Sequence, residues 1–192
     1  MLAGFALIIV ATLFRLLPVF LGATVVQPEW LPNFSPMAAL CLCCAACLPR
    51  RWAFAVPFTA LLATDFILNT HYGFPLVNTQ MVLKNIAFIA IAALGWQLRN
   101  RARAGVLLPA TILSSLFFYV VTNTASWLAE PAYAKSLAGL VQALTTGLPG
   151  YPSTWTFYRN TFASDLVFTS LFLLSLRLPL PAKSTEPVAV AS

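Results

Sequence analysis

Residues 106–128 read VLLPATILSSLFFYVVTNTASWL and contain no charged side chain. A helix needs ~20 mainly apolar residues to cross a membrane, because the hydrocarbon core is ~30 Å thick. This segment is therefore predicted to be a transmembrane helix. The whole chain agrees with that prediction: 60% of its 192 residues are hydrophobic and only 8% are charged, whereas soluble domains carry roughly a quarter charged residues.

Other apolar runs flank this segment, and together they predict an all-α membrane protein with a bundle of about six transmembrane helices. The expected helices cover residues 2–21, 37–48, 53–68, 76–98, 106–128 and 161–178. The second and third are short, and one re-entrant hairpin is the alternative for that pair. A mixed stretch at 130–158 is expected to hold an interfacial or re-entrant helix at 134–144. We expect a single domain at 1–178 and a disordered cytoplasmic tail at 179–192.

Basic residues give the orientation. Lys and Arg are enriched in the cytoplasmic loops of membrane proteins, and a path of six spans puts most of them on one side. Both termini are then expected in the cytoplasm, in a multi-pass protein of the bacterial inner membrane. The net charge of +6 is spread over short gaps between apolar runs, so the lipid bilayer is the expected partner and nucleic acid is not. The residues on the predicted cytoplasmic side are Arg50, Arg51, Arg99, Arg101, Arg103, Arg177 and Lys183.

Four ionisable residues fall inside the expected spans: Arg15, Asp65, Lys84 and Asp165. Each costs roughly 2.5–3.5 kcal/mol at a helix centre, and such residues normally face the bundle interior or a wet cavity. With ~1.5 Å of rise per residue, all four lie in the outer half of the membrane. We interpret them as one outward-facing polar cavity that binds a small-molecule substrate. The neutral residues expected on its wall are Asn33, Asn123, Trp127 and Asn160.

The sequence also lacks several chemistries. It has no GxxxxGK[ST] phosphate loop, no GxSxG and no HExxH motif, and its single His excludes most hydrolase triads. We therefore expect no enzyme activity, no catalytic residues, no cofactor and no metal site. A cluster of cysteines is read as small packing groups, with soft-metal transfer as a weaker alternative. The cluster comprises Cys41, Cys43, Cys44 and Cys47.

Several short motifs carry a family resemblance over most of the chain. The most specific are the Asn33-Phe34-Ser35-Pro36 turn and the Arg159-Asn160-Thr161 segment. With these, the chain resembles an uncharacterised family of bacterial membrane transport proteins, which in turn looks similar to the S components of energy-coupling-factor (ECF) vitamin transporters. The other matching residues are Arg15, Pro18, Ala38, Ala39, Pro57, Asp65, Phe117, Phe118, Asn123, Trp127, Asp165 and Leu166.

The resemblance implies a six-helix protein with an outward-facing substrate pocket. It also implies that a separate transmembrane coupling subunit and ATPases supply the energy. The chain departs from the S components in one respect. They dock through a small-xxx-small pair in their first helix, whereas in the helix expected at 2–21 Ala6 is followed four residues later by Val10. The alternative function is that of an interaction subunit with the same build, as in bacterial cell-shape machinery.

Overall fold

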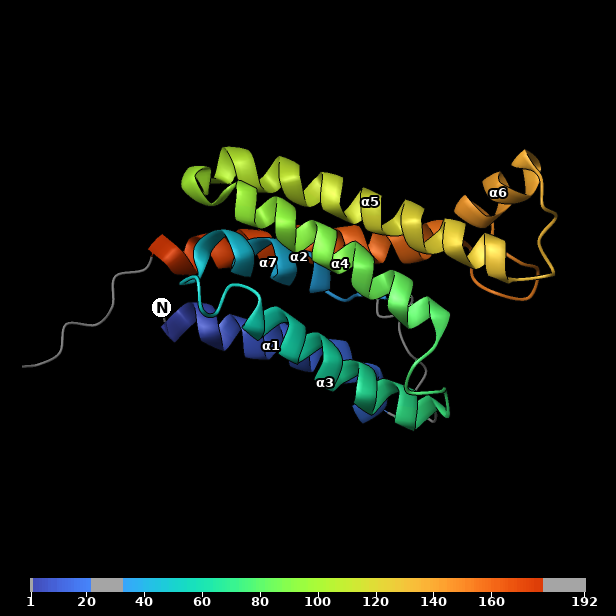
Figure 1. Ribbon diagram of the computed structural model, residues 1–192, viewed down its shortest axis with the longest axis horizontal. Helices are drawn as coiled ribbons and strands as arrows, with labels where there is room; N and C mark the ends of the chain where they lie inside the picture. Colours follow the sequence, from blue (N-terminus) through green and yellow to red (C-terminus); the bar gives the residue numbers. More distant parts are fainter. Residues whose placement is uncertain (1, 22–32, 178–192) are drawn as a thin grey trace, which may run out of the picture.

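The computed structural model describes residues 2–21 and 33–177. Within them the chain is all-helical, with seven α-helices, one short 3₁₀ helix and no strand (Figure 1). This confirms the all-α prediction, while the expected tail at 179–192 lies outside the described residues. The elements are α1 (Leu2–Leu21), α2 (Met37–Cys47), α3 (Ala55–Tyr72), α4 (Thr79–Gln97), η1 (Arg99–Arg101), α5 (Ala104–Ala129), α6 (Leu137–Leu144) and α7 (Thr154–Arg177).

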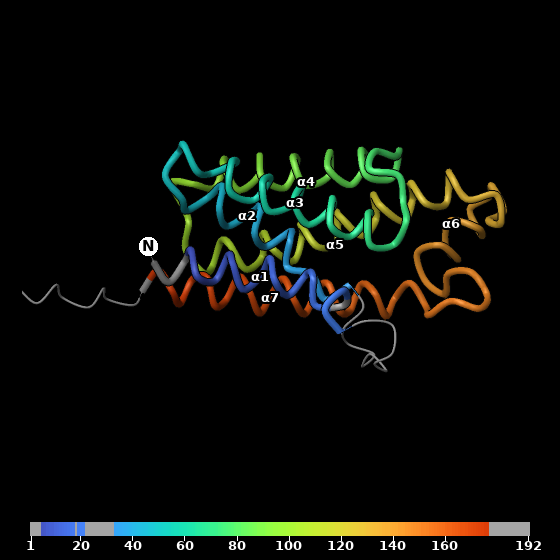
Figure 2. The backbone as a smooth tube through the Cα atoms, turned by 90° about the horizontal axis from the view of Figure 1, so that it is seen from below, coloured from blue at the N-terminus to red at the C-terminus, as the bar shows by residue number. Residues whose placement is uncertain are grey.

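The long helices α1, α3, α4, α5 and α7 run along the long axis of the molecule, and α6 lies at one end (Figures 1 and 2). The start of α1 and the end of α7 lie together at the opposite end. Among the helices that the structure describes, α4 and α5 are long and apolar enough to cross a membrane by length and composition. The sequence predicted about six transmembrane helices, so fewer of the described helices meet this criterion than predicted.

Helix α2 explains part of that difference. It has 11 residues, which at 1.5 Å per residue is a length of about 16 Å, or half of a hydrocarbon core. It is buried from Met37 to Ala46 and packs against α1, α3, α4, α5 and α7. The helix expected at 37–48 is therefore too short to cross a bilayer alone. Its sequence is apolar on all sides, which suits a site enclosed by other helices.

Two helices extend beyond their expected ends. Helix α3 continues to Tyr72 and stops at Gly73, which has a φ of 70°. Glycine adopts this left-handed conformation without steric cost and often terminates helices. Helix α7 begins at Thr154 instead of residue 161, because its polar first two turns resemble a loop in sequence. The short helix expected at 134–144 is present as α6, with Ser136 as its N-cap.

Helices α2 and α4 approach each other closely at Gly95. A methyl group on Gly95 would overlap the carbonyl oxygen of Leu42 and would lie 3.1 Å from Cβ of Ala45. Both neighbours belong to the buried helix, so neither can move away freely. Glycine is required here for close backbone approach rather than for a special φ angle.

Gly95→Ala should therefore destabilise the bundle by about 1–3 kcal/mol, the usual cost of overpacking a core. Thermal unfolding in detergent measures the effect. Gly105→Ala is the matched control, because no atom lies within 4 Å of a methyl group placed there. The close approach would be refuted if the two variants unfolded at the same temperature.

Candidate functional site

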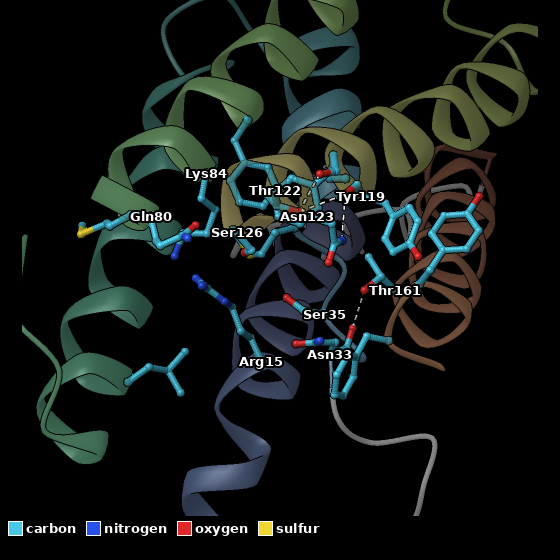
Figure 3. Close-up of a pocket in the computed structure, with 18 of the residues that line it drawn as sticks. Arg15, Asn33, Ser35, Gln80, Lys84, Tyr119, Thr122, Asn123, Ser126 and Thr161 are labelled. Carbon is cyan, nitrogen blue, oxygen red and sulfur yellow. Dashed lines mark hydrogen bonds between the residues drawn. The ribbon is translucent and has the colours of Figure 1, made fainter. Parts of the chain in front are cut away.

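A cavity of about 800 Å³ lies between α1, α3, α4, α5 and α7, with the turn at 33–36 and the start of α2 on its wall (Figure 3). Amide, hydroxyl and cationic side chains line it together with aromatic rings. The polar lining residues are Arg15, Asn33, Ser35, Asn69, Tyr72, Asn78, Gln80, Lys84, Tyr119, Thr122, Asn123, Ser126, Thr154, Tyr158 and Thr161. Several of them were singled out from the sequence.

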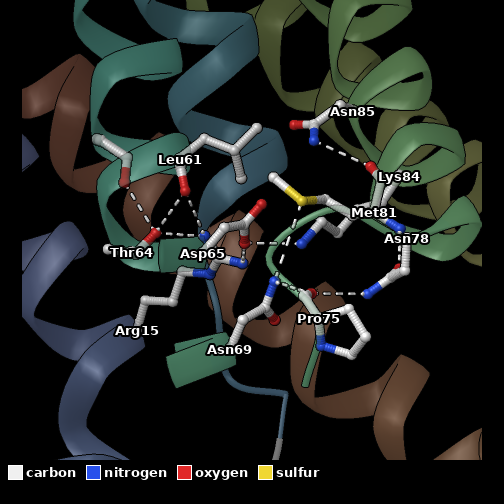
Figure 4. A network of polar contacts seen from close by, with 11 residues as sticks. Arg15, Leu61, Thr64, Asp65, Asn69, Pro75, Asn78, Met81, Lys84 and Asn85 are labelled. Carbon is white, nitrogen blue, oxygen red and sulfur yellow. Dashed lines mark hydrogen bonds and ion pairs between the residues drawn. The ribbon is translucent and has the colours of Figure 1, made fainter. Parts of the chain in front are cut away.

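One carboxylate organises the charged part of the wall (Figure 4). Oδ1 of Asp65 on α3 accepts a hydrogen bond from Nη2 of Arg15 on α1 at 2.6 Å, and another from Nζ of Lys84 on α4 at 2.7 Å. Arg15 also donates to Oγ1 of Thr64 and, at 3.3 Å, to the carbonyl of Leu61. Asp65 is only 2% exposed. Three helices are thus joined by opposite charges, which offsets the cost of burying each one.

This ion cluster of Arg15, Asp65 and Lys84 leaves the cavity positive. The two cations line the cavity, whereas Asp65 is not among its described lining residues. No Asp or Glu is among the described lining residues. Two positive charges and one negative charge give the cluster a net charge of +1.

Asp165 does not join this cluster, although the sequence analysis expected all four embedded charges to converge. It is fully buried, and its Oδ1 accepts the backbone N–H of Ala39 at 3.0 Å while its Oδ2 accepts the hydroxyl of Ser115 at 2.5 Å. The N-cap of α2 is Pro36, whose side chain makes no capping hydrogen bond. Asp165 supplies that cap from α7, because its Oδ1 accepts a backbone N–H that has no partner within the helix.

A positive charge lies at the other end of α2. Arg99 donates to the carbonyl of Ala45 at 3.1 Å and to the carbonyl of Leu48, and its guanidinium lies 4.9 Å from the ring centre of Trp96. Cations stabilise the C-terminal end of a helix. Both ends of the buried α2 are therefore held by hydrogen bonds with side chains outside the helix, Asp165 at the first end and Arg99 at the last.

The four neutral residues expected on the wall divide evenly. Asn33 and Asn123 line the cavity, whereas Trp127 and Asn160 do not. Asn33 has a φ of 59°, and its carbonyl accepts the hydroxyl of Thr161 at 2.9 Å. Trp127 instead donates to the carbonyl of Ala134 at 2.8 Å and so holds the loop before α6. Asn160 is buried and accepts from Nε of Arg159 at 3.3 Å.

Sequence reasoning missed Asn78 and the aromatic part of the lining. Asn78 is the N-cap of α4 and accepts the N–H of Met81 at 2.8 Å. A start signal for the helix at Asn78, in place of residue 76, could have located it. The rings carried no such signal, because an aromatic residue on a membrane helix looks the same whether it faces lipid or a cavity. The rings that line the cavity are Phe14, Phe34, Tyr72, Phe74, Phe88, Phe118, Tyr119, Phe157 and Tyr158.

The fold and the site together define a helical protein with an aromatic-lined cavity whose charged wall is positive. The chain belongs to a family of unknown function, DUF6580, whose model matches residues 1–185. No curated protein and no solved structure matches the chain.

The capping role of Asp165 predicts a graded loss of stability. Asp165→Ala removes the acceptor of a buried N–H and should cost about 1–3 kcal/mol. Asp165→Asn should cost less, because an amide oxygen can still accept from Ala39. Ser170→Ala on the same helix is the control, since Ser170 is exposed and its hydroxyl donates to the Leu166 carbonyl one turn before it. Thermal unfolding measures the effect. If Asp165→Asn lowered the unfolding temperature as much as Asp165→Ala, the capping role would be contradicted.

Proposed function

We propose that this chain is a multi-pass inner-membrane protein that binds a small molecule in an outward-facing cavity for uptake. The observation that carries the proposal is the cavity itself: about 800 Å³, within the ~300–1,000 Å³ of small-molecule sites. Cations, amides and hydroxyls converge on it from α1, α4, α5 and α7. Embedded polar groups in a membrane protein mark substrate pathways by default.

Six passes follow if α2 and the turn before it together make the second one. Five long helices then cross the membrane, and α2 completes its pass within the protein, where an irregular backbone is tolerated. The basic residues of η1 and of the α2–α3 connection lie at the end where α1 starts and α7 finishes (Figures 1 and 2). The positive-inside rule makes that end cytoplasmic.

The cavity then opens toward the outside. Its lining includes Asn69 near the end of α3, Gln80 at the start of α4, Ser126 near the end of α5 and Thr154 at the start of α7. All four positions lie far from the basic end. A binding subunit of this kind needs a partner for energy, and the resemblance to ECF S components favours a transmembrane coupling subunit with ATPases.

Cysteine labelling tests the orientation. In a variant with all four native cysteines replaced by Ala, Tyr133→Cys should react with a membrane-impermeant thiol reagent applied to intact cells. Ala102→Cys, between η1 and α5, should react only after the cells are opened. The reverse pattern would contradict the outward-facing cavity.

Ligand screening tests the function. A molecule that binds only the folded protein raises its stability by RT ln(1 + [L]/Kd), about 2.7 kcal/mol at 100 times Kd. We expect some members of a metabolite panel to raise the unfolding temperature of the detergent-solubilised protein. Ser126→Trp, which fills the cavity, should abolish this stabilisation, while Ser170→Trp on the exposed face of α7 should preserve it. Stabilisation that persists unchanged in Ser126→Trp would place the ligand elsewhere.

A further inference from the structure

We infer that the ligand of this cavity is a small organic anion that carries an aromatic or similarly flat ring. The inference rests on the proposed function and names its substrate class. It starts from the net charge of +1 on the ion cluster, which no acidic side chain among the described lining residues offsets. A low-dielectric cavity of one sign concentrates ligands of the opposite sign.

Unused donors point to the same class. An Arg side chain has five N–H donors and a Lys side chain has three. Within the described residues, Arg15 donates three hydrogen bonds, to Leu61, Thr64 and Asp65. Lys84 donates one, to Asp65. Two donors remain on each cation beside the cavity. Four N–H groups from two cations suit a carboxylate, which accepts through two oxygens.

The remainder of the wall favours a ring. Phe88 and Phe118 stack with their centroids 4.6 Å apart, and Tyr119 and Tyr158 also lie 4.6 Å apart. In Figure 3, Arg15 extends from α1 below and Lys84 from α4 above, and Tyr119 lies to the right of both. Aromatic walls favour flat apolar groups through stacked or edge-on contacts. A ligand with its anionic group at the two cations and its ring among the aromatic side chains would contact both the charged and the aromatic part of the wall.

Amide side chains on the cavity wall favour a water-soluble ligand over a phospholipid. Asn33, Gln80 and Asn123 all line the cavity, and their side chains donate and accept hydrogen bonds. A phospholipid would place acyl chains against these groups and leave them unpaired, at a cost in free energy. We therefore commit to a soluble anion, and a lipid anion becomes an outcome of the test.

The first arm of the test measures the sign of the cavity potential without a known ligand. Ser126→Cys, in the otherwise Cys-free chain, is reconstituted in phosphatidylcholine nanodiscs and treated with methanethiosulfonate reagents bearing either a sulfonate or a trimethylammonium group. Each rate is divided by the rate at Tyr133→Cys, in the connection between α5 and α6. We expect the anionic reagent to be favoured roughly tenfold, and Lys84→Gln to reduce that preference. A cationic preference would overturn the inference alone, whereas an unreactive Ser126→Cys would overturn the proposed function with it.

The second arm tests the ring with three matched probes: indole-3-acetate, its neutral amide indole-3-acetamide, and acetate. Indole-3-acetate should slow modification of Ser126→Cys severalfold, and the other two should slow it less. Equal slowing by the amide would overturn the charge requirement, and equal slowing by acetate would overturn the ring. No slowing by any probe also overturns the inference. If phosphatidylglycerol in the nanodisc slows the anionic reagent while indole-3-acetate does not, the anion is a lipid headgroup and our assignment is wrong.

Discussion

The sharing of one carboxylate oxygen by two cations is the interaction on which the cavity depends. Oδ1 of Asp65 on α3 accepts a hydrogen bond from Arg15 on α1 and another from Lys84 on α4. An unpaired charge in this environment is costly, so the three helices gain stability only in the arrangement that brings these groups together. Because two cations share one anion, the same arrangement leaves a positive surface on the cavity wall. The contacts that join the three helices therefore also give the cavity wall its positive charge.

A second constraint comes from the short helix α2. A helix that begins inside the bundle exposes N–H groups that neither water nor its own residues can satisfy. Asp165 satisfies one of them at the N-terminal end, and Arg99 accounts for two carbonyl groups at the other. With α2 held in this way, the turn before it brings Asn33 and Phe34 to the cavity wall. The two acidic residues embedded in the bundle therefore have different roles: Asp65 fixes the cations and Asp165 fixes a helix.

The sequence predicted the helical architecture, and the depth of the charges was enough to suggest that Arg15, Asp65 and Lys84 meet. Depth did not identify the partner of Asp165, because helix periodicity gives height along the bundle but not direction around it. That direction depends on how α2 packs, and its uniformly apolar sequence has no polar face to indicate it. Trp127 and Asn160 were assigned to the cavity wall for the same reason: both are at the right height but make other contacts.

A double-mutant cycle tests the central claim that Asp65 holds Lys84 at the cavity wall. The free energy of unfolding is measured for Lys84→Met and Asp65→Asn, singly and together, and the cycle is repeated with Asp165→Asn in place of Asp65→Asn. Contacting charges should show a coupling energy of about 0.5–3 kcal/mol, while independent sites should be additive within about 0.5 kcal/mol. We predict coupling between Lys84 and Asp65 and additivity between Lys84 and Asp165. Coupling of Lys84 to Asp165, with none to Asp65, would contradict the claim.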